Sequence, residues 1–175
     1  RYGINWLLRT RFGDGFRALA VEYSIWQPNV VSSKETINLN QKGNIRSIAE
    51  NGAYENFLAS GALAKAALAF KELDKNFSSW CQRTACEDFA LAMEGYQKGC
   101  HTKRWGVIPK AQICGEAALD ASLIYQLTGD QSYLDIASQM ADIVISCQEQ
   151  ELNPAWDYPL RGFFYEDPDH KYLLT

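Results

Sequence analysis

Two segments of this chain, 57–70 and 117–127, are almost entirely apolar. Their few polar residues are Ser60 and Lys65 in the first segment and Asp120, Ser122 and Gln126 in the second. A helix that is apolar on every side has to be buried on every side. The sequence therefore predicts two helices in the interior of an all-α domain.

Each apolar helix is followed by a tight turn and a second, amphipathic helix. The expected helices are 54–73 and 77–96 in the first hairpin, and 111–127 and 131–148 in the second. The apolar stripes of the return helices are Phe77, Cys81, Ala85, Phe89, Ala92 and Tyr96, and then Tyr133, Leu134, Ala137, Met140, Ala141, Val144 and Ile145. Asp74 and Asp130 are expected to cap the return helices, and Gly129 suits a left-handed helix end.

The two hairpins repeat with a period of about 56 residues, since Asp74 corresponds to Asp130 and Phe77 to Tyr133. Such a repeat is typical of a two-ring helical toroid or of a solenoid. We expect residues 1–175 to be part of a single toroid-shaped domain. A helical-repeat binding module of the tetratricopeptide type is an alternative, although its repeats are shorter.

The connections between hairpins are long, at 12–53, 97–110 and from 150 onward. In antiparallel hairpins all tight turns lie at one end and all long loops at the other, and long loops in compact domains are usually functional. The aromatic residues of these loops are Tyr23, Trp26, Trp105, Trp156, Tyr158, Phe163, Phe164 and Tyr165. Flat rings suit stacking on sugar rings, and the alternative is that they pack the loops onto the helix ends.

Polar residues near the expected loop end are the second group of candidates. Glu116 is the only carboxylate in the first turns of its inner helix, where the helix dipole favours negative charge. Its alternative role is to aid helix initiation. The residues proposed to bind substrate are Asp14, Glu22, Trp26, Trp105, Glu116, Trp156 and His170. Asp14 is also a turn former, and His170 follows an acidic stretch, 166–169, that binds a cation or sugar hydroxyls or is simply solvated.

Composition excludes several other classes of protein. The chain has 175 residues, of which 47% are hydrophobic and 22% charged, as in an ordinary globular domain. A net charge of −4 argues against a nucleic-acid partner, and no apolar run is long enough to predict a membrane span. The five cysteines fit no zinc spacing, so we expect mostly buried thiols, with one disulfide among Cys100, Cys114 and Cys147 as an alternative.

Several segments resemble glycoside hydrolase family 9, which contains cellulases. Residues 125–134, Tyr-Gln-Leu-Thr-Gly-Asp-Gln-Ser-Tyr-Leu, are similar to the family's Leu-Tyr-x-Ala-Thr-Gly-Asp-x-x-Tyr-Leu segment. When the alignment is continued from Tyr125 toward the N-terminus without a gap, Glu116 falls on the Glu of the family's Asp-Glu-Leu-x-Trp-Ala-Ala stretch. Gly115 and Leu119 then occupy the Asp and Trp positions. Residues 12–15 resemble its Val-Gly-Asp, and 22–26 lie where Asp-His-x-x-Trp is expected, with Tyr23 in place of the His.

The resemblance implies a divergent and partial (α/α)6 barrel that acts on a β-linked glucan or a related polysaccharide or oligosaccharide. The family's catalytic base and acid match no part of this chain, so we expect them outside it. The resemblance also implies a carbohydrate substrate, a secreted or periplasmic location, and no cofactor, although a structural calcium ion is compatible with it. An unsaturated glucuronyl hydrolase or a sugar epimerase on a similar toroid is the second enzymatic alternative.

Overall fold

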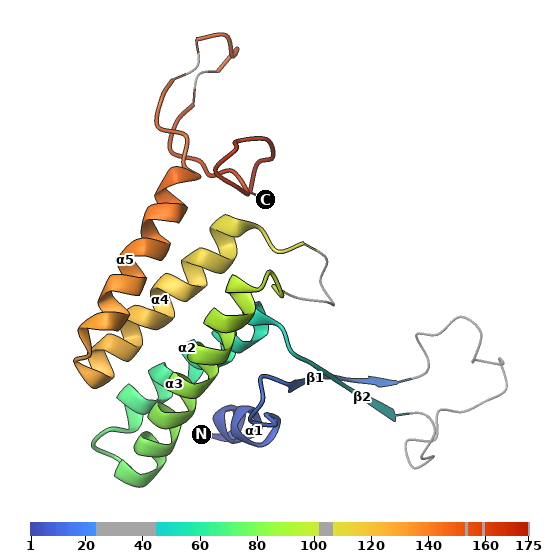
Figure 1. The fold of residues 1–175 in the computed structure, drawn as a ribbon, viewed down its shortest axis with the longest axis vertical. Coiled ribbons are helices and arrows are strands. Elements are labelled where there is room, and N and C mark those ends of the chain that lie inside the picture. The colour runs from blue at the N-terminus through green and yellow to red at the C-terminus, as the bar shows by residue number, and fades with distance from the viewer. Residues whose placement is uncertain (24–44, 102–106, 153, 159, 175) are drawn as a thin grey trace, which may run out of the picture.

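The computed structural model describes residues 1–23, 45–101, 107–152, 154–158 and 160–174. In order along the chain, the elements are α1 (Tyr2–Arg9), β1 (Arg17–Tyr23), β2 (Ile45–Glu50), α2 (Ala53–Phe70), α3 (Lys75–Gln97), α4 (Lys110–Thr128) and α5 (Gln131–Ser146). The four long helices form two hairpins that stand side by side, with both tight turns at one end and the long connections at the other (Figure 1). The prediction of an all-α fold built from helix hairpins is confirmed.

The turns within the hairpins are built as the sequence predicts. Asp74 accepts a hydrogen bond from the backbone N–H of Phe77 at 3.0 Å, and Asp130 accepts one from Ser132 at 3.0 Å. Gly129 closes α4 with a φ of 70°, which a residue without a Cβ adopts without strain. These caps explain why the observed helix ends agree with the predicted ones to within about three residues.

The inner helices α2 and α4 pack against each other, and each packs against the outer helix of its own hairpin. Large apolar side chains with almost no exposed surface fill the space between them: Phe57, Leu63, Ile113 and Ile124. Phe57 meets Phe89 of α3 edge to face at 5.6 Å. The apolar stripe of α3 is confirmed, with Phe77, Cys81, Ala85, Phe89 and Ala92 all buried. On α5 only Ala137 and Met140 are buried, and Ile145 is 52% exposed.

Burial of the inner helices on every side is not observed. Leu58 on α2 is 44% exposed and Leu119 on α4 is 43% exposed, and Lys65 is also exposed. The physical reason is that α3, α4 and α5 cover only part of the circumference of these helices. α1 and β1 also contact α2, where Leu58 lines a cavity together with Leu7 and Ala18. The described helices form two adjacent hairpins and no closed ring.

The segment 12–53 contains a two-stranded antiparallel sheet, which corrects its assignment as a loop. β1 pairs with β2 in a register that places Arg17 opposite Glu50 and Tyr23 opposite Ile45, with an irregularity between Ala18 and Ala20. The strand ribbon projects away from the helices (Figure 1). The run Ala-Leu-Ala-Val-Glu-Tyr at 18–23 is short and contains β-branched and aromatic residues, which is a strand signal.

A buried ion cluster fixes the beginning of β1 to the first hairpin. The guanidinium of Arg17 pairs with the carboxylate of Asp88 on α3, and both side chains are almost fully buried. Arg11 adds a second contact to Asp88 at 2.9 Å, and Arg17 also donates to the carbonyl of Leu7 in α1 at 2.9 Å. The cluster therefore joins α1, β1 and α3. Among the described helices, none is long and apolar enough to cross a membrane.

Candidate functional site

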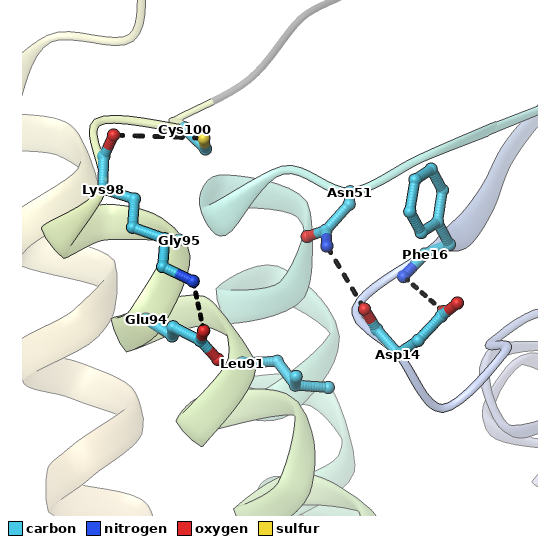
Figure 2. A pocket seen from close by; sticks show the side chains of 8 residues that line it. All are labelled: Asp14, Phe16, Asn51, Leu91, Glu94, Gly95, Lys98 and Cys100. Atoms are coloured by element: carbon cyan, nitrogen blue, oxygen red, sulfur yellow. Dashed lines mark hydrogen bonds and ion pairs between the residues drawn. The ribbon is translucent and has the colours of Figure 1, made fainter.

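Asp14 lies in a tight loop at one wall of a cavity of about 260 Å³. Its carboxylate accepts a hydrogen bond from the N–H of Phe16 at 3.1 Å, and Asn51 donates to its backbone carbonyl at 3.2 Å. Figure 2 shows Asp14, Phe16 and Asn51 on one side of this cavity and residues of α3 on the other. The facing groups are Glu94 of α3 and Lys98 directly after it, which form an ion pair. The cavity is therefore polar at its rim and holds both hydrogen-bond donors and acceptors.

Three predicted site residues have no described side chain. Glu22 lies in β1, where its Cα partner in β2 is Arg46, and the structure describes nothing of its side chain. Trp26 and Trp105 lie outside the described residues. Their assignment as substrate-binding residues stays a prediction.

Trp156 lies in an aromatic cluster beyond the ends of α4 and α5. Its ring stacks on Phe163 at 5.7 Å, and Phe163 meets Tyr165 edge to face at 5.2 Å. These rings line a cavity of about 560 Å³ together with Leu160, Phe164, Leu173 and Leu174. Trp156 itself remains 37% exposed. Its apolar surroundings show that packing accounts for part of its role, while the exposed part of the ring stays accessible to a ligand.

His170 contributes to the docking of the C-terminal segment. Its ring stacks on Tyr165 at 4.3 Å, and its Nε2 donates to the carbonyl of Ser146 at 2.9 Å, at the C-terminal end of α5. The backbone N–H of Ala111, in the first turn of α4, donates to the carbonyl of Glu166 at 2.9 Å. Both contacts satisfy groups that helix ends leave unpaired. The segment around His170 is thereby held at the loop end of the second hairpin.

Glu116 lies in the second turn of α4, half-buried, and faces α2. One helical turn further along is Asp120, which has no exposed surface. A Cβ placed on Gly61 of α2 would lie 2.0 Å from one carboxylate oxygen of Asp120 and 3.5 Å from one of Glu116. The two carboxyl groups therefore converge on the notch beside Gly61, and the absence of a side chain at Gly61 creates this space.

Asp120 is the most perturbed carboxyl group in this region. Neither of its carboxylate oxygens has a hydrogen-bond partner in good geometry among the described residues. Burial, with a further contribution from the negative charge of Glu116, raises the pKa of Asp120 to about 8. The ammonium group of Lys65 and the backbone of Gly61 oppose this shift only partly. Asp120 is therefore largely protonated at neutral pH.

The cysteines contribute no cross-link, because all five are free thiols. Cys81, Cys114 and Cys147 are buried as expected, whereas Cys100 is exposed. Within the described residues, no group of three or more histidine, cysteine or acidic side chains is arranged to hold a metal ion.

The four candidate residues whose side chains the structure describes do not converge on a single cavity. Asp14 and Trp156 line two cavities that share no residue, and Glu116 faces the notch at Gly61. Sequence reasoning noticed Asp120 only as a polar exception in an apolar helix. Its environment depends on Gly61, which is far away in the sequence, so no local signal reveals it.

Taken together, paired inner and outer helices with long loops at one end resemble part of an α/α barrel. A solved structure with a similar fold is the cellulase Cel9M of C. cellulolyticum, with a TM-score of 0.64 and 17% sequence identity. The similarity covers 87% of this chain and 35% of the cellulase, so the chain spans about a third of that structure. No protein-family model matches the sequence, and no curated protein matches it. The likeness concerns the fold alone.

Proposed function

We propose that this chain is part of a glycoside hydrolase that acts on a β-linked glucan or on a related polysaccharide or oligosaccharide. The observation that carries the proposal is the similarity of its fold to that of a cellulase over most of its length. A fold by itself does not define a reaction, because one architecture hosts many chemistries. The side chains at the loop end therefore have to support the proposal.

Two features of the loop end suit a sugar. Sugar rings have apolar faces, which aromatic rings cover, and the half-exposed ring of Trp156 offers such a surface. They also carry many hydroxyl groups, which need hydrogen-bond acceptors, and Asp14 and Glu116 supply carboxylate oxygens. This combination of rings and carboxylates is typical of a polysaccharide-binding face.

The charge at this end favours a neutral sugar over an acidic one. Asp14 is an exposed carboxylate, and Glu94 in the same cavity is already paired with Lys98, so the cavity carries a net negative charge. A uronate would meet repulsion there, since like charges brought together in a partly desolvated site are unfavourable. We therefore prefer a neutral glucan to the substrate of an unsaturated glucuronyl hydrolase.

Hydrolysis of a glycosidic bond uses a pair of carboxyl groups on opposite sides of the bond. We assign no such pair among the described residues, because Asp120 has no exposed surface and the acidic residues at the loop end lie in separate places. In our proposal residues 1–175 supply part of the substrate-binding surface, and the catalytic acid and base lie outside them.

The test is cleavage of a substrate panel by the full-length protein. The panel contains soluble cellulose derivatives, mixed-linkage β-glucan and an unsaturated uronide disaccharide, with release of reducing ends as the readout. We expect cleavage of a neutral β-glucan and none of the uronide. Glu116→Gln and Trp26→Ala should each lower kcat/KM by about tenfold or more, the effect of losing one charged hydrogen bond or one stacked ring.

Glu72→Gln is the matched control for Glu116→Gln. It makes the same chemical change on an exposed glutamate at the tight-turn end of the first hairpin, and it should leave kcat/KM unchanged. No cleavage of any glucan by the wild type would contradict the proposed function. Cleavage that both loop-end variants leave intact would contradict the assignment of the binding residues and not the reaction.

A further inference from the structure

We propose that Asp120 is a buried positioning residue that carries a proton for Glu116, so that the two carboxyl groups share a single negative charge in the notch beside Gly61. The effect on substrate binding rests on the proposed function, because it assumes that Glu116 receives sugar hydroxyls. The sharing of the charge does not depend on that assumption.

The geometry of the notch brings the two carboxyl groups together. Asp120 follows Glu116 by four residues on α4, so both side chains point to the same face of the helix. That face meets α2 at Gly61, where any side chain would collide with Asp120. Hence the close approach of the inner helices at this point requires a glycine on one and leaves room for a carboxyl group on the other.

The burial of the notch determines which group holds the proton. Asp120 has no exposed surface and no hydrogen-bond donor in good geometry among the described residues. A carboxylate in such a place loses its hydration without replacement, which strongly favours the neutral acid. Glu116 is only half-buried and keeps contact with solvent. The more buried group, Asp120, is therefore the one that holds the proton.

Few charged groups act on the notch. Glu116 disfavours ionisation of Asp120 from the same helix, and Lys65 favours it from α2. Within the described part of the chain, no charged group outside α2 and α4 contributes to the pKa of Asp120. Lys65 is exposed, so water weakens its attraction. The protonation of Asp120 thus depends on Glu116 and on burial more than on any cation.

This arrangement would keep Glu116 in place as a hydrogen-bond acceptor. If both groups were ionised, their repulsion would push Glu116 out of the notch or separate α2 from α4. With a neutral Asp120 beneath it, Glu116 keeps its place and accepts hydrogen bonds from sugar hydroxyls. Asp120 does not touch the sugar, and its influence passes through Glu116.

The first test measures chemical unfolding of the full-length protein at a series of pH values between 5 and 8. The folded state holds a proton on Asp120 up to a pKa of about 8, whereas the unfolded state releases it near the ordinary value of 3.8. Stability should therefore fall as the pH rises, and this group makes the unfolding equilibrium constant increase by up to about tenfold for each pH unit.

Asp120→Asn should remove this part of the pH dependence, since the amide cannot ionise and all other titrating groups are retained. Glu116→Gln should end the fall in stability at a lower pH than in the wild type, because Asp120 then ionises more readily in the folded state. An equal slope in the wild type and in Asp120→Asn would overturn the proposal. The ¹³C carboxyl resonance of Asp120 in the wild type gives a second readout that requires no variant. A protonated signal at pH 7 is expected, and an ionised signal would also overturn the proposal.

The second test concerns the sugar. The affinity of the wild type for the β-glucan that it binds should decrease by up to about tenfold between pH 7 and pH 9, as the notch gains its second charge. The affinity of Asp120→Asn should stay constant over that range. If the wild type binds no glucan, the proposed function fails, while the unfolding experiment still decides the sharing of the proton. If the affinities of the wild type and of Asp120→Asn depend on pH in the same way, the proposed effect of Asp120 on sugar binding through Glu116 is wrong.

Discussion

Two aspartates in this molecule are almost equally buried but differ in the groups that surround them. Asp88 on the outer helix α3 is 1% exposed, and Asp120 on the inner helix α4 is fully buried. Asp88 is held by Arg17 and by Arg11, whose two guanidinium groups bind its two oxygens. Asp120 meets no such partner among the described residues. Asp88 is therefore part of an ion cluster, whereas Asp120 lies beside another acid without a paired cation.

The difference shows how one residue type serves two purposes. Burial raises the pKa of Asp88, and the two arginines oppose this effect because they favour the carboxylate. That pairing fixes α1 and β1 onto the hairpin, so its role is structural. At Asp120 nothing comparable opposes burial, so the group costs stability when it ionises. A costly group in an otherwise well-packed inner helix is a reason to look for a role other than stability.

The largest expected effect is at Asp88. Asp88→Ala leaves Arg17 buried without its partner, which should destabilise the protein by about 3–5 kcal/mol. Equilibrium unfolding in denaturant measures this change. The double variant Arg17→Met with Asp88→Leu should lose much less, because no buried charge remains unpaired. If the double variant is as unstable as Asp88→Ala, the cluster contributes through its shape and not through its charges.

A smaller effect is expected at Gly61, and it tests the contact with Asp120. In the wild type Gly61→Ala should destabilise by about 1–3 kcal/mol, since the new methyl group overlaps the carboxyl group of Asp120. In an Asp120→Ala background the same change should stabilise by up to about 1 kcal/mol, because alanine is a better helix former than glycine. A double-mutant cycle by chemical unfolding measures both values. A cycle in which the two changes are additive would show that the notch does not couple these residues.

The helices could be predicted from the sequence, whereas the surroundings of the two buried aspartates could not. Helix ends depend on local chemistry, such as the caps at Asp74 and Asp130, and these were correctly predicted. The pairing of Asp88 depends on Arg17, which lies 71 positions away in a segment whose strand was missed. Periodicity likewise shows that Asp120 lies on an apolar helix and cannot show that a glycine of another helix faces it. Contacts between residues that are distant in the sequence cannot be predicted from local sequence patterns.

Asp74 and Asp130 extend the comparison to aspartates nearer the surface, and they should give the smallest effect. The backbone N–H of Phe77, and then Arg1, lower the pKa of Asp74, while Ser132 lowers the pKa of Asp130. Each stabilises the fold above its ordinary pKa and loses that contribution as the pH falls, which is the opposite sign to Asp120. Asp74→Ala should lower the Tm more than Asp130→Ala, because Asp74 also forms an ion pair with Arg1 at 2.7 Å. Thermal unfolding at pH 7 and at pH 3 measures both. The difference between each variant and the wild type should shrink at the lower pH, and a difference that grows instead would show that these aspartates stabilise the helices without their charge.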